Sequence, residues 1–310
     1  MDKLQSDAAH ISRVLCILFM SYVHLHFFKL SGAVFPITDI IVVDTFGRSS
    51  VPLLSVLSGY FMVTFFAKRS YTIAALSRGR SLIVPMIIWN LVACILFGFT
   101  YPLWNSLIAA MDQSKLIYLT FLRDLFILSL LTPALVLCAK KAPWIFATAI
   151  FIYYLSGWSN IVVLRPQIAF FFSLGVFLAL YPQPMPRGSR VIALIGVTAA
   201  IFWQVIRPDL SGFYFDNLYL RPITAFSFWV LALWIAANQP KIGKFDKTAF
   251  AFFLMHGIIF TVVGSVYSKI PVLHTIPIYY MIWLLTPLIS YAAIYLLWPL
   301  TGKFGRVVTA

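Results

Sequence analysis

The chain has 310 residues, of which 62% are hydrophobic and only 10% are charged. Soluble domains are about half apolar and about a quarter charged, so this composition excludes a protein with one or two soluble cores and predicts an all-α polytopic membrane protein. The net charge of +14 comes from 23 basic residues against nine Asp and no Glu, an excess that in membrane proteins marks topology rather than nucleic-acid binding, so no nucleic-acid partner is expected.

Ten apolar stretches meet the length criterion for a membrane-spanning helix. They cover approximately residues 12–30, 51–67, 82–100, 117–137, 143–156, 168–181, 191–206, 222–238, 248–267 and 278–298. The fifth and sixth are short for a span, which predicts helices that are tilted, broken or shielded by their neighbours. The three cysteines fall within these stretches at unrelated spacings and predict neither a disulfide framework nor a metal site. We expect a single transmembrane domain over residues 1–310, with a core of about 7–300 and no appended soluble domain.

The distribution of basic residues predicts that both termini are cytoplasmic. With the N-terminus inside, 15 of the 23 Lys and Arg residues fall on the cytoplasmic side and seven on the other, Arg123 lying within a span. This is the positive-inside pattern. The cytoplasmic loops could also attract anionic lipid headgroups or a phosphate-bearing ligand, and the sequence does not separate that role from topology alone.

Arg13 and His24 lie eleven residues apart on the first apolar stretch. Eleven helical steps of about 100° return to within roughly 20° of the start, so both side chains share one helix face, about 16 Å apart along the axis. Arg13 would then lie at a water boundary and His24 within the membrane, where an ionisable group is a candidate functional residue. His10 lies one turn before Arg13 and could assist it.

Polar and small residues flank and interrupt the second predicted span. Arg48 precedes it, and Ser58 and Gly59 lie inside it. Gly59 could make room for a ligand chain while the Ser58 hydroxyl donates a hydrogen bond, or both could simply let helices pack closely. The basic connection that follows contains Arg78 and Arg80, whose guanidinium groups suit bidentate contacts with phosphate.

Four further charged or ionisable residues fall at membrane depth or near it. Arg123 and Asp124 are adjacent at the outer end of the fourth span, and Arg165 lies in the outer loop before the sixth. The adjacent pair could be neutralised by partners on other helices, by each other or by snorkelling, so a structural ion pair is an alternative to a binding role. His256 places a second imidazole in the ninth span, where a hydrogen-bonded packing role is the alternative.

Six short motifs, in this order, resemble integral-membrane acyltransferase family 3 from about residue 7 to residue 300. They are Arg13 with His24, Ser58-Gly59-Tyr60, the basic segment before Pro85, Phe121-Leu122-Arg123-Asp124-Leu125-Phe126, Phe170-Phe171-Phe172-Ser173-Leu174-Gly175 and Phe253-Leu254-Met255-His256-Gly257. The resemblance implies a ten-helix domain that moves an acyl group, commonly acetyl from cytoplasmic acetyl-CoA, to a hydroxyl of a carbohydrate or lipid-linked glycan. It also implies a multi-pass protein of the cytoplasmic (inner) membrane, because the family is abundant in bacteria.

The resemblance suggests roles for the residues singled out above. His24 is expected to be catalytic, either as a general base or by carrying the acyl group as a short-lived acyl-imidazole. The residues expected to hold acyl-CoA are Arg13, Arg78 and Arg80. The residues expected to bind the acceptor or support the site are Arg48, Ser58, Gly59, Arg123, Asp124, Arg165 and His256. No permanently bound cofactor is expected; the expected partners are acyl-CoA as donor, a glycan acceptor and the lipid bilayer.

Two other functions fit parts of the pattern. Proline-interrupted helices and intramembrane charges also suit a transporter or flippase of a glycan intermediate or small solute, although the chain shows no evident repeat of two similar halves. A non-catalytic scaffold would leave the shared face of Arg13 and His24 unexplained. Consumption of acyl-CoA without any gradient would separate an enzyme from a transporter.

Overall fold

The computed structural model describes residues 3–25, 38–98, 103–108, 116–157, 165–182, 184–206 and 216–301, and within these ranges all regular secondary structure is helical. The prediction of an all-α protein is confirmed for this part of the chain. The chain divides into two compact units, the first made of Met1–Leu53 with Pro186–Gly302 and the second centred on Leu54–Met185. The division falls inside helix α3 (Arg48–Ala67).

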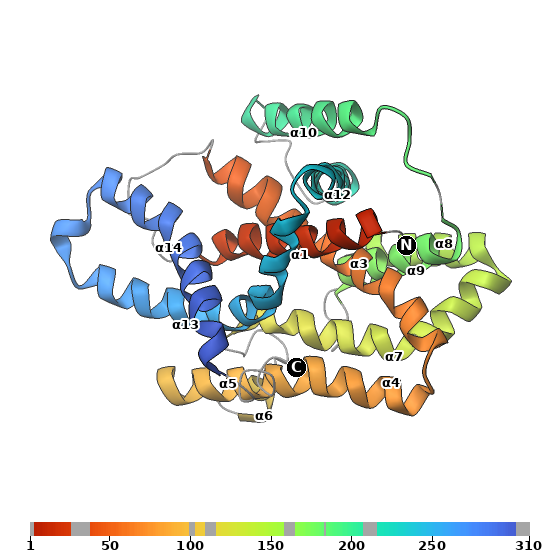
Figure 1. Cartoon of the computed structure of the whole chain (residues 1–310), viewed down its shortest axis with the longest axis horizontal. Helices are drawn as coiled ribbons and strands as arrows, with labels where there is room; N and C mark the ends of the chain where they lie inside the picture. Colours follow the sequence, from red (N-terminus) through yellow and green to blue (C-terminus); the bar gives the residue numbers. More distant parts are fainter. Residues whose placement is uncertain are drawn as a thin grey trace. The chain divides into compact units, whose positions relative to one another are not determined.

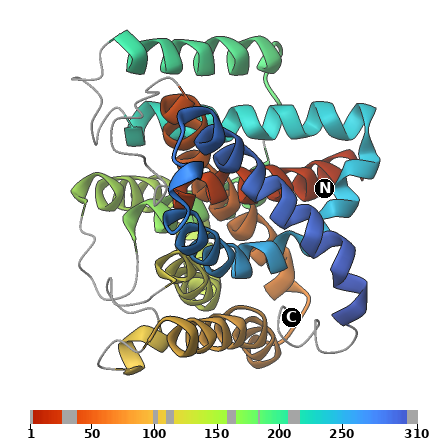
Figure 2. The same cartoon turned by 90° about the vertical axis from the view of Figure 1, so that its left-hand side faces the viewer.

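Helix α1 is the centre of the first unit, where it packs against η2, α12, α13 and α14 (Figures 1 and 2). The elements of this unit are α1 (Lys3–Val23), η2 (Asp39–Gly47), the start of α3, α10 (Ser189–Ile206), η6 (Asp216–Leu220), α12 (Arg221–Asn238), η7 (Pro240–Phe245), α13 (Asp246–Ser268), η8 (Pro271–Leu273), α14 (Ile276–Leu297) and η9 (Trp298–Thr301). Small residues allow the approach of α1 and α12, since Ala8 and Ile11 form a buried cluster with Ala232 and Ala236. Close contact through small side chains is typical of helices in membranes.

Three neighbours of α1 run antiparallel to it. Early α1 residues meet the end of α12, whereas Phe19, near the end of α1, meets Phe228 at a ring distance of 5.5 Å. Phe19 also contacts Phe46 of η2 at 5.2 Å. Near the start of α14, the Tyr22 hydroxyl donates a 2.8 Å hydrogen bond to the Leu284 carbonyl. These are the relative directions that the second, eighth and tenth of ten consecutive crossings require with respect to the first.

The second unit is organised around α7, which packs against α4, η3, α8 and α9; α7 is yellow and α8 and α9 are green in Figure 1. Its elements are the rest of α3, α4 (Tyr71–Arg78), η3 (Gly79–Ile83), α5 (Val84–Phe97), α6 (Leu103–Leu107), η4 (Ile117–Leu119), α7 (Thr120–Lys141), α8 (Pro143–Ser156) and α9 (Pro166–Leu180). Proline occupies the first turn of α5, α8 and α9, where its missing N–H costs no intrahelical hydrogen bond.

Seven helices of the described part are long and apolar enough to cross a membrane. They are Asp39–Ala67, Tyr71–Phe97, Ile117–Lys141, Ser189–Ile206, Asp216–Asn238, Asp246–Ser268 and Pro277–Leu300. The predicted fifth and sixth segments form the shorter apolar helices Pro143–Ser156 and Pro166–Leu180. The first predicted segment corresponds to α1, which begins nine residues earlier than expected, at Lys3, because the polar turns before the apolar run are helical too; residues 26–30 of that segment lie outside the described ranges. A polytopic membrane protein is therefore supported, while the count of ten and the orientation of the termini stay predictions.

Candidate functional site

His24 and His256 lie side by side in the first unit, with their ring centroids 5.3 Å apart. His24 occupies the tight turn that directly follows α1 and is half-buried, whereas His256 lies within α13 and is completely buried. The His256 Nδ1 atom lies 2.7 Å from the Phe253 carbonyl. Because a carbonyl only accepts, Nδ1–H is the donor, and the neutral imidazole then carries its lone pair on Nε2. The structure thus gives the candidate catalytic imidazole a second imidazole of fixed tautomer as its neighbour.

Arg13 is ion-paired to Asp246, the first residue of α13. Its Nη1 atom lies 2.8 Å from Asp246 Oδ2, and His10 Nδ1 lies 2.6 Å from the same oxygen. A carboxylate in the first turn of a helix is also favoured by the partial positive charge of that helix end. Arg13 therefore spends one of its five N–H donors on this pair and, with its side chain 39% exposed, retains others for a ligand.

Asp246 was not anticipated from the sequence, although a signal existed. It precedes His256 by ten residues, much as Arg13 precedes His24 by eleven. Two helices that carry a charged residue and a histidine at matching spacing can form both contacts only when they run parallel and in register. Helices α1 and α13 do so, which is the relative direction that a first and a ninth crossing require.

An apolar groove of about 390 Å³ lies between α1 and α14; Arg13 and Asp246 do not line it, although their chain neighbours Val14 and Phe245 do. Val14 and Leu18 of α1 form one wall, Tyr291 and Tyr295 of α14 form the other, and Phe245 lies directly before the paired aspartate. The Tyr291 hydroxyl donates a 2.7 Å hydrogen bond to the Phe245 carbonyl, which ties α14 to the start of α13. The volume and the apolar lining are of the kind found in small-molecule sites.

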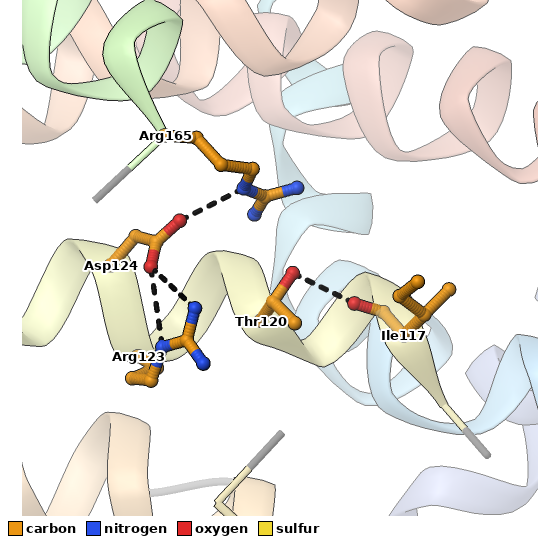
Figure 3. Close-up of polar contacts among 5 residues, drawn as sticks. All are labelled: Ile117, Thr120, Arg123, Asp124 and Arg165. Carbon is orange, nitrogen blue, oxygen red and sulfur yellow. Dashed lines mark hydrogen bonds and ion pairs between the residues drawn. The ribbon is translucent and has the colours of Figure 1, made fainter. Parts of the chain in front are cut away.

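The second unit contains a buried carboxylate held between two arginines. Asp124 is completely buried in α7; its Oδ1 accepts from Arg123 Nη2 at 3.1 Å and its Oδ2 from Arg165 Nε at 2.8 Å (Figure 3). The position of Arg165 follows from Pro166, the first residue of α9, since the residue before a proline is kept out of the helical region. Arg165 accordingly has an extended backbone, with φ −71° and ψ 124°, at the N-cap of α9. The structure thus joins Arg165, which the sequence placed before the sixth span, to the adjacent pair on the fourth span.

Arg78 and Arg80, two of the arginines expected to hold acyl-CoA, lie at the end of α4 and in η3 of the second unit. The Arg78 guanidinium lies over the Phe65 ring at 4.3 Å, and Arg69 lies over the same ring at 4.5 Å. Within the described ranges the Arg78 Nε atom is buried and has no hydrogen-bond partner. Arg80 is exposed. Arg78 and Arg80 belong to a different unit from Arg13, so their joint role toward one ligand stays a prediction.

Gly59 faces backbone rather than an open channel. A Cβ atom built on Gly59 would lie 2.0 Å from the Phe172 carbonyl oxygen, and one built on Gly175 would lie 2.0 Å from the Val56 carbonyl oxygen. Helices α3 and α9 therefore approach each other through a reciprocal pair of glycines. The space beside Gly59 that could have admitted a ligand chain is filled by α9, while Ser58 is half-buried on the same helix.

Arg48 forms an exposed ion pair with a residue four positions earlier in the chain. Its Nε atom lies 2.9 Å from Asp44 Oδ1, one helical turn earlier, and both side chains are more than 40% exposed. Such pairs contribute little to stability. The expected role of Arg48 in acceptor binding stays a prediction.

Together, the apolar helices and the polar sites among them define an integral-membrane protein with ionisable side chains on its helices. The chain belongs to acyltransferase family 3, because the family model described as an acyltransferase domain matches residues 8–302. This confirms the resemblance drawn from the six motifs.

Among curated proteins, the chain is similar to the succinoglycan biosynthesis protein ExoH of Rhizobium meliloti (strain 1021), with 25% identity over 242 residues. The aligned region covers 70% of this chain and 65% of that relative, so the chain spans less than two thirds of the relative's length. No solved structure matches the chain.

Proposed function

We propose that the protein is a membrane-bound O-acyltransferase that moves an acyl group, expected to be acetyl, from acyl-CoA to a hydroxyl of a polysaccharide, lipopolysaccharide or lipid-linked glycan. Family membership supports the reaction class. The polysaccharide acceptor is supported by the relative, which is named as a succinoglycan biosynthesis protein. The observation that carries the proposal is the position of His24 at the end of α1, next to the buried His256.

In the proposed reaction, the His24 imidazole is the base or the nucleophile, and the thioester of acyl-CoA supplies the leaving group. As a general base, His24 takes the proton from the acceptor hydroxyl while its oxygen attacks the thioester carbonyl, and the proton then goes to the departing CoA thiolate. Alternatively, a His24 nitrogen attacks the thioester carbonyl and expels the CoA thiolate, which takes the imidazole N–H proton. The acyl group then passes to the acceptor oxygen, and the proton of the acceptor hydroxyl returns to the imidazole. Both routes balance, and both require a nitrogen lone pair on His24. His256 is the proposed positioning residue for its ring.

The surroundings of Arg13 support the donor half of the proposal. Arg13, in the middle of α1, is held by Asp246 and keeps free donor capacity for a phosphate of CoA. The apolar groove lined by Val14 and Leu18 begins at the next residue and could take the methylene chain of the donor or a longer acyl group. An anionic head beside Arg13 with an apolar arm in the groove is the arrangement we propose for acyl-CoA.

The test is release of CoA thiol from acetyl-CoA by purified protein supplied with a glycan acceptor, in detergent and without any ion gradient. We expect acceptor-dependent release by the wild type and a loss on the order of 10²- to 10⁴-fold in His24→Ala, because a positioned base contributes about that factor. His274→Ala is the matched control, since His274 is an exposed histidine that contacts the Tyr267 carbonyl. Full activity in His24→Ala would overturn the assignment of His24, and absence of thiol release with every acyl-CoA and glycan would favour the transporter.

A further inference from the structure

Two arginines of the second unit share the carboxylate of Asp124. Asp124 supplies one negative charge and is completely buried, while Arg123 and Arg165 supply two positive charges, with side-chain exposures of 15% and 33%. Arginine stays protonated in proteins. Charges removed from water are usually paired, so the hydrogen-bond partners of each guanidinium decide what more it can bind.

One nitrogen atom of Arg165 has no hydrogen-bond partner among the described residues. Arg165 donates to Asp124 through Nε, whereas its Nη2 atom is buried and, within the described residues, has no hydrogen-bond partner. Figure 3 shows the terminal nitrogens of Arg165 extending beyond the carboxylate of Asp124. Asp124 thus fixes the guanidinium by one edge and leaves a donor available. A planar guanidinium with available N–H groups binds carboxylate and phosphate oxygens with high geometric specificity.

We infer that Arg165, held by Asp124 and flanked by Arg123, binds an oxyanion, a carboxylate or phosphate, carried by the sugar acceptor. The acceptor part of this inference rests on the proposed function, whereas the oxyanion site itself does not. Acceptor glycans with acidic substituents or a phosphate link present such a group. The site would select charged acceptors and would orient them by the charged group rather than by the hydroxyl that reacts.

The test uses three sugars that differ only in the group at C6: glucose, glucuronic acid and glucose 6-phosphate. Their dissociation constants are measured for purified protein in nanodiscs of neutral phosphatidylcholine, in the absence of acyl-CoA, so the result does not depend on turnover. We expect at least one anionic sugar to bind wild-type protein on the order of 10- to 100-fold more tightly than glucose, the range of a charge-assisted hydrogen-bond pair.

Substitutions at Arg165 distinguish binding at this site from a general attraction of anionic sugars to the positively charged protein. Arg165→Gln should abolish the preference for the anionic sugar, and Arg165→Lys, which keeps the charge beside Asp124 but lacks the planar fork, should reduce it while the protein stays folded. Lys140→Gln, which removes an exposed charge at the other end of α7, should retain the full preference. If Arg165→Gln does not fold, the comparison of Arg165→Lys with Lys140→Gln decides the outcome.

Two results would overturn the inference. One is equal binding of all three sugars to the wild type, or a preference that survives both substitutions of Arg165. The other is loss of the preference when the nanodiscs contain phosphatidylglycerol, which would assign the oxyanion to a lipid headgroup instead of the acceptor. Failure of the catalytic proposal would leave the binding result unchanged, since His24→Ala protein should show the same sugar preference as the wild type.

Discussion

The guanidinium of Arg13 and the carboxylate of Asp246 lie 2.8 Å apart and join the middle of α1 to the first residue of α13. Three helical turns further along the same two helices, His24 meets His256. The ion pair therefore sets the register and the axial rotation of α1 against α13, and the histidine contact depends on both. A charged pair between two parallel helices in this way helps to position the proposed reactive group three turns further along them.

The energetic coupling of Arg13 and Asp246 is the first prediction. In a double-mutant cycle of Arg13→Ala, Asp246→Ala and the double variant, we expect a coupling free energy of about 1 kcal/mol, because the pair is partly exposed on the arginine side. Unfolding in mixed micelles with a denaturing detergent measures it. Both single variants should also lower turnover, since α1 loses its register.

A coupling indistinguishable from zero would show that the pair does not hold the two helices. Asp44 and Arg48 supply the control cycle, because this exposed pair lies within one helical segment and cannot set a register between helices.

Removal of the buried carboxylate in the second unit should be strongly destabilising. Asp124→Ala leaves two arginine charges facing each other without their acceptor, and we expect a loss of about 3–5 kcal/mol in the free energy of unfolding. Asp44→Ala should cost less than about 1 kcal/mol, since its partner is solvated. Similar losses in the two variants, measured by detergent titration, would contradict the role of Asp124 as a buried anchor.

The close approach of α3 and α9 predicts a steric penalty at Gly175. Gly175→Ala places a methyl group 2.0 Å from the Val56 carbonyl oxygen, so the helices must separate, at a cost of about 1–3 kcal/mol. Gly79→Ala is the matched control, because its Cβ would meet only Phe126 Cε2 at an ordinary 3.7 Å. Thermal unfolding of the two variants should differ clearly; equal midpoints would mean that the crossing is looser than the structure describes.

The topology yields a prediction that is independent of activity. In a background without Cys16, Cys94 and Cys138, a cysteine at Lys269 should react with a membrane-impermeant maleimide in intact cells. A cysteine at Lys68 should react only after permeabilisation, because the positive-inside pattern places it in the cytoplasm. The opposite labelling would reverse the predicted orientation of both termini.

What the sequence by itself determined depends on the length and the periodicity of single helices. The bilayer sets a minimum length for an apolar helix, so the positions of the apolar segments were predictable, including the short fifth and sixth. The helical period predicted that Arg13 and His24 share one face, and both do contact α13. Class, segments and the candidate catalytic histidine therefore followed from patterns within a few helical turns.

Only the tertiary structure decided which distant residue each of these groups meets. Asp246 as the partner of Arg13, His256 as the neighbour of His24 and Arg165 as the second arginine on Asp124 all join helices far apart in the chain. Gly59, open to two interpretations in the sequence, meets the backbone of α9 because Gly175 lets that helix approach. Such contacts depend on how several helices pack at once, and helical periodicity shows which face a residue lies on but not which helix covers that face.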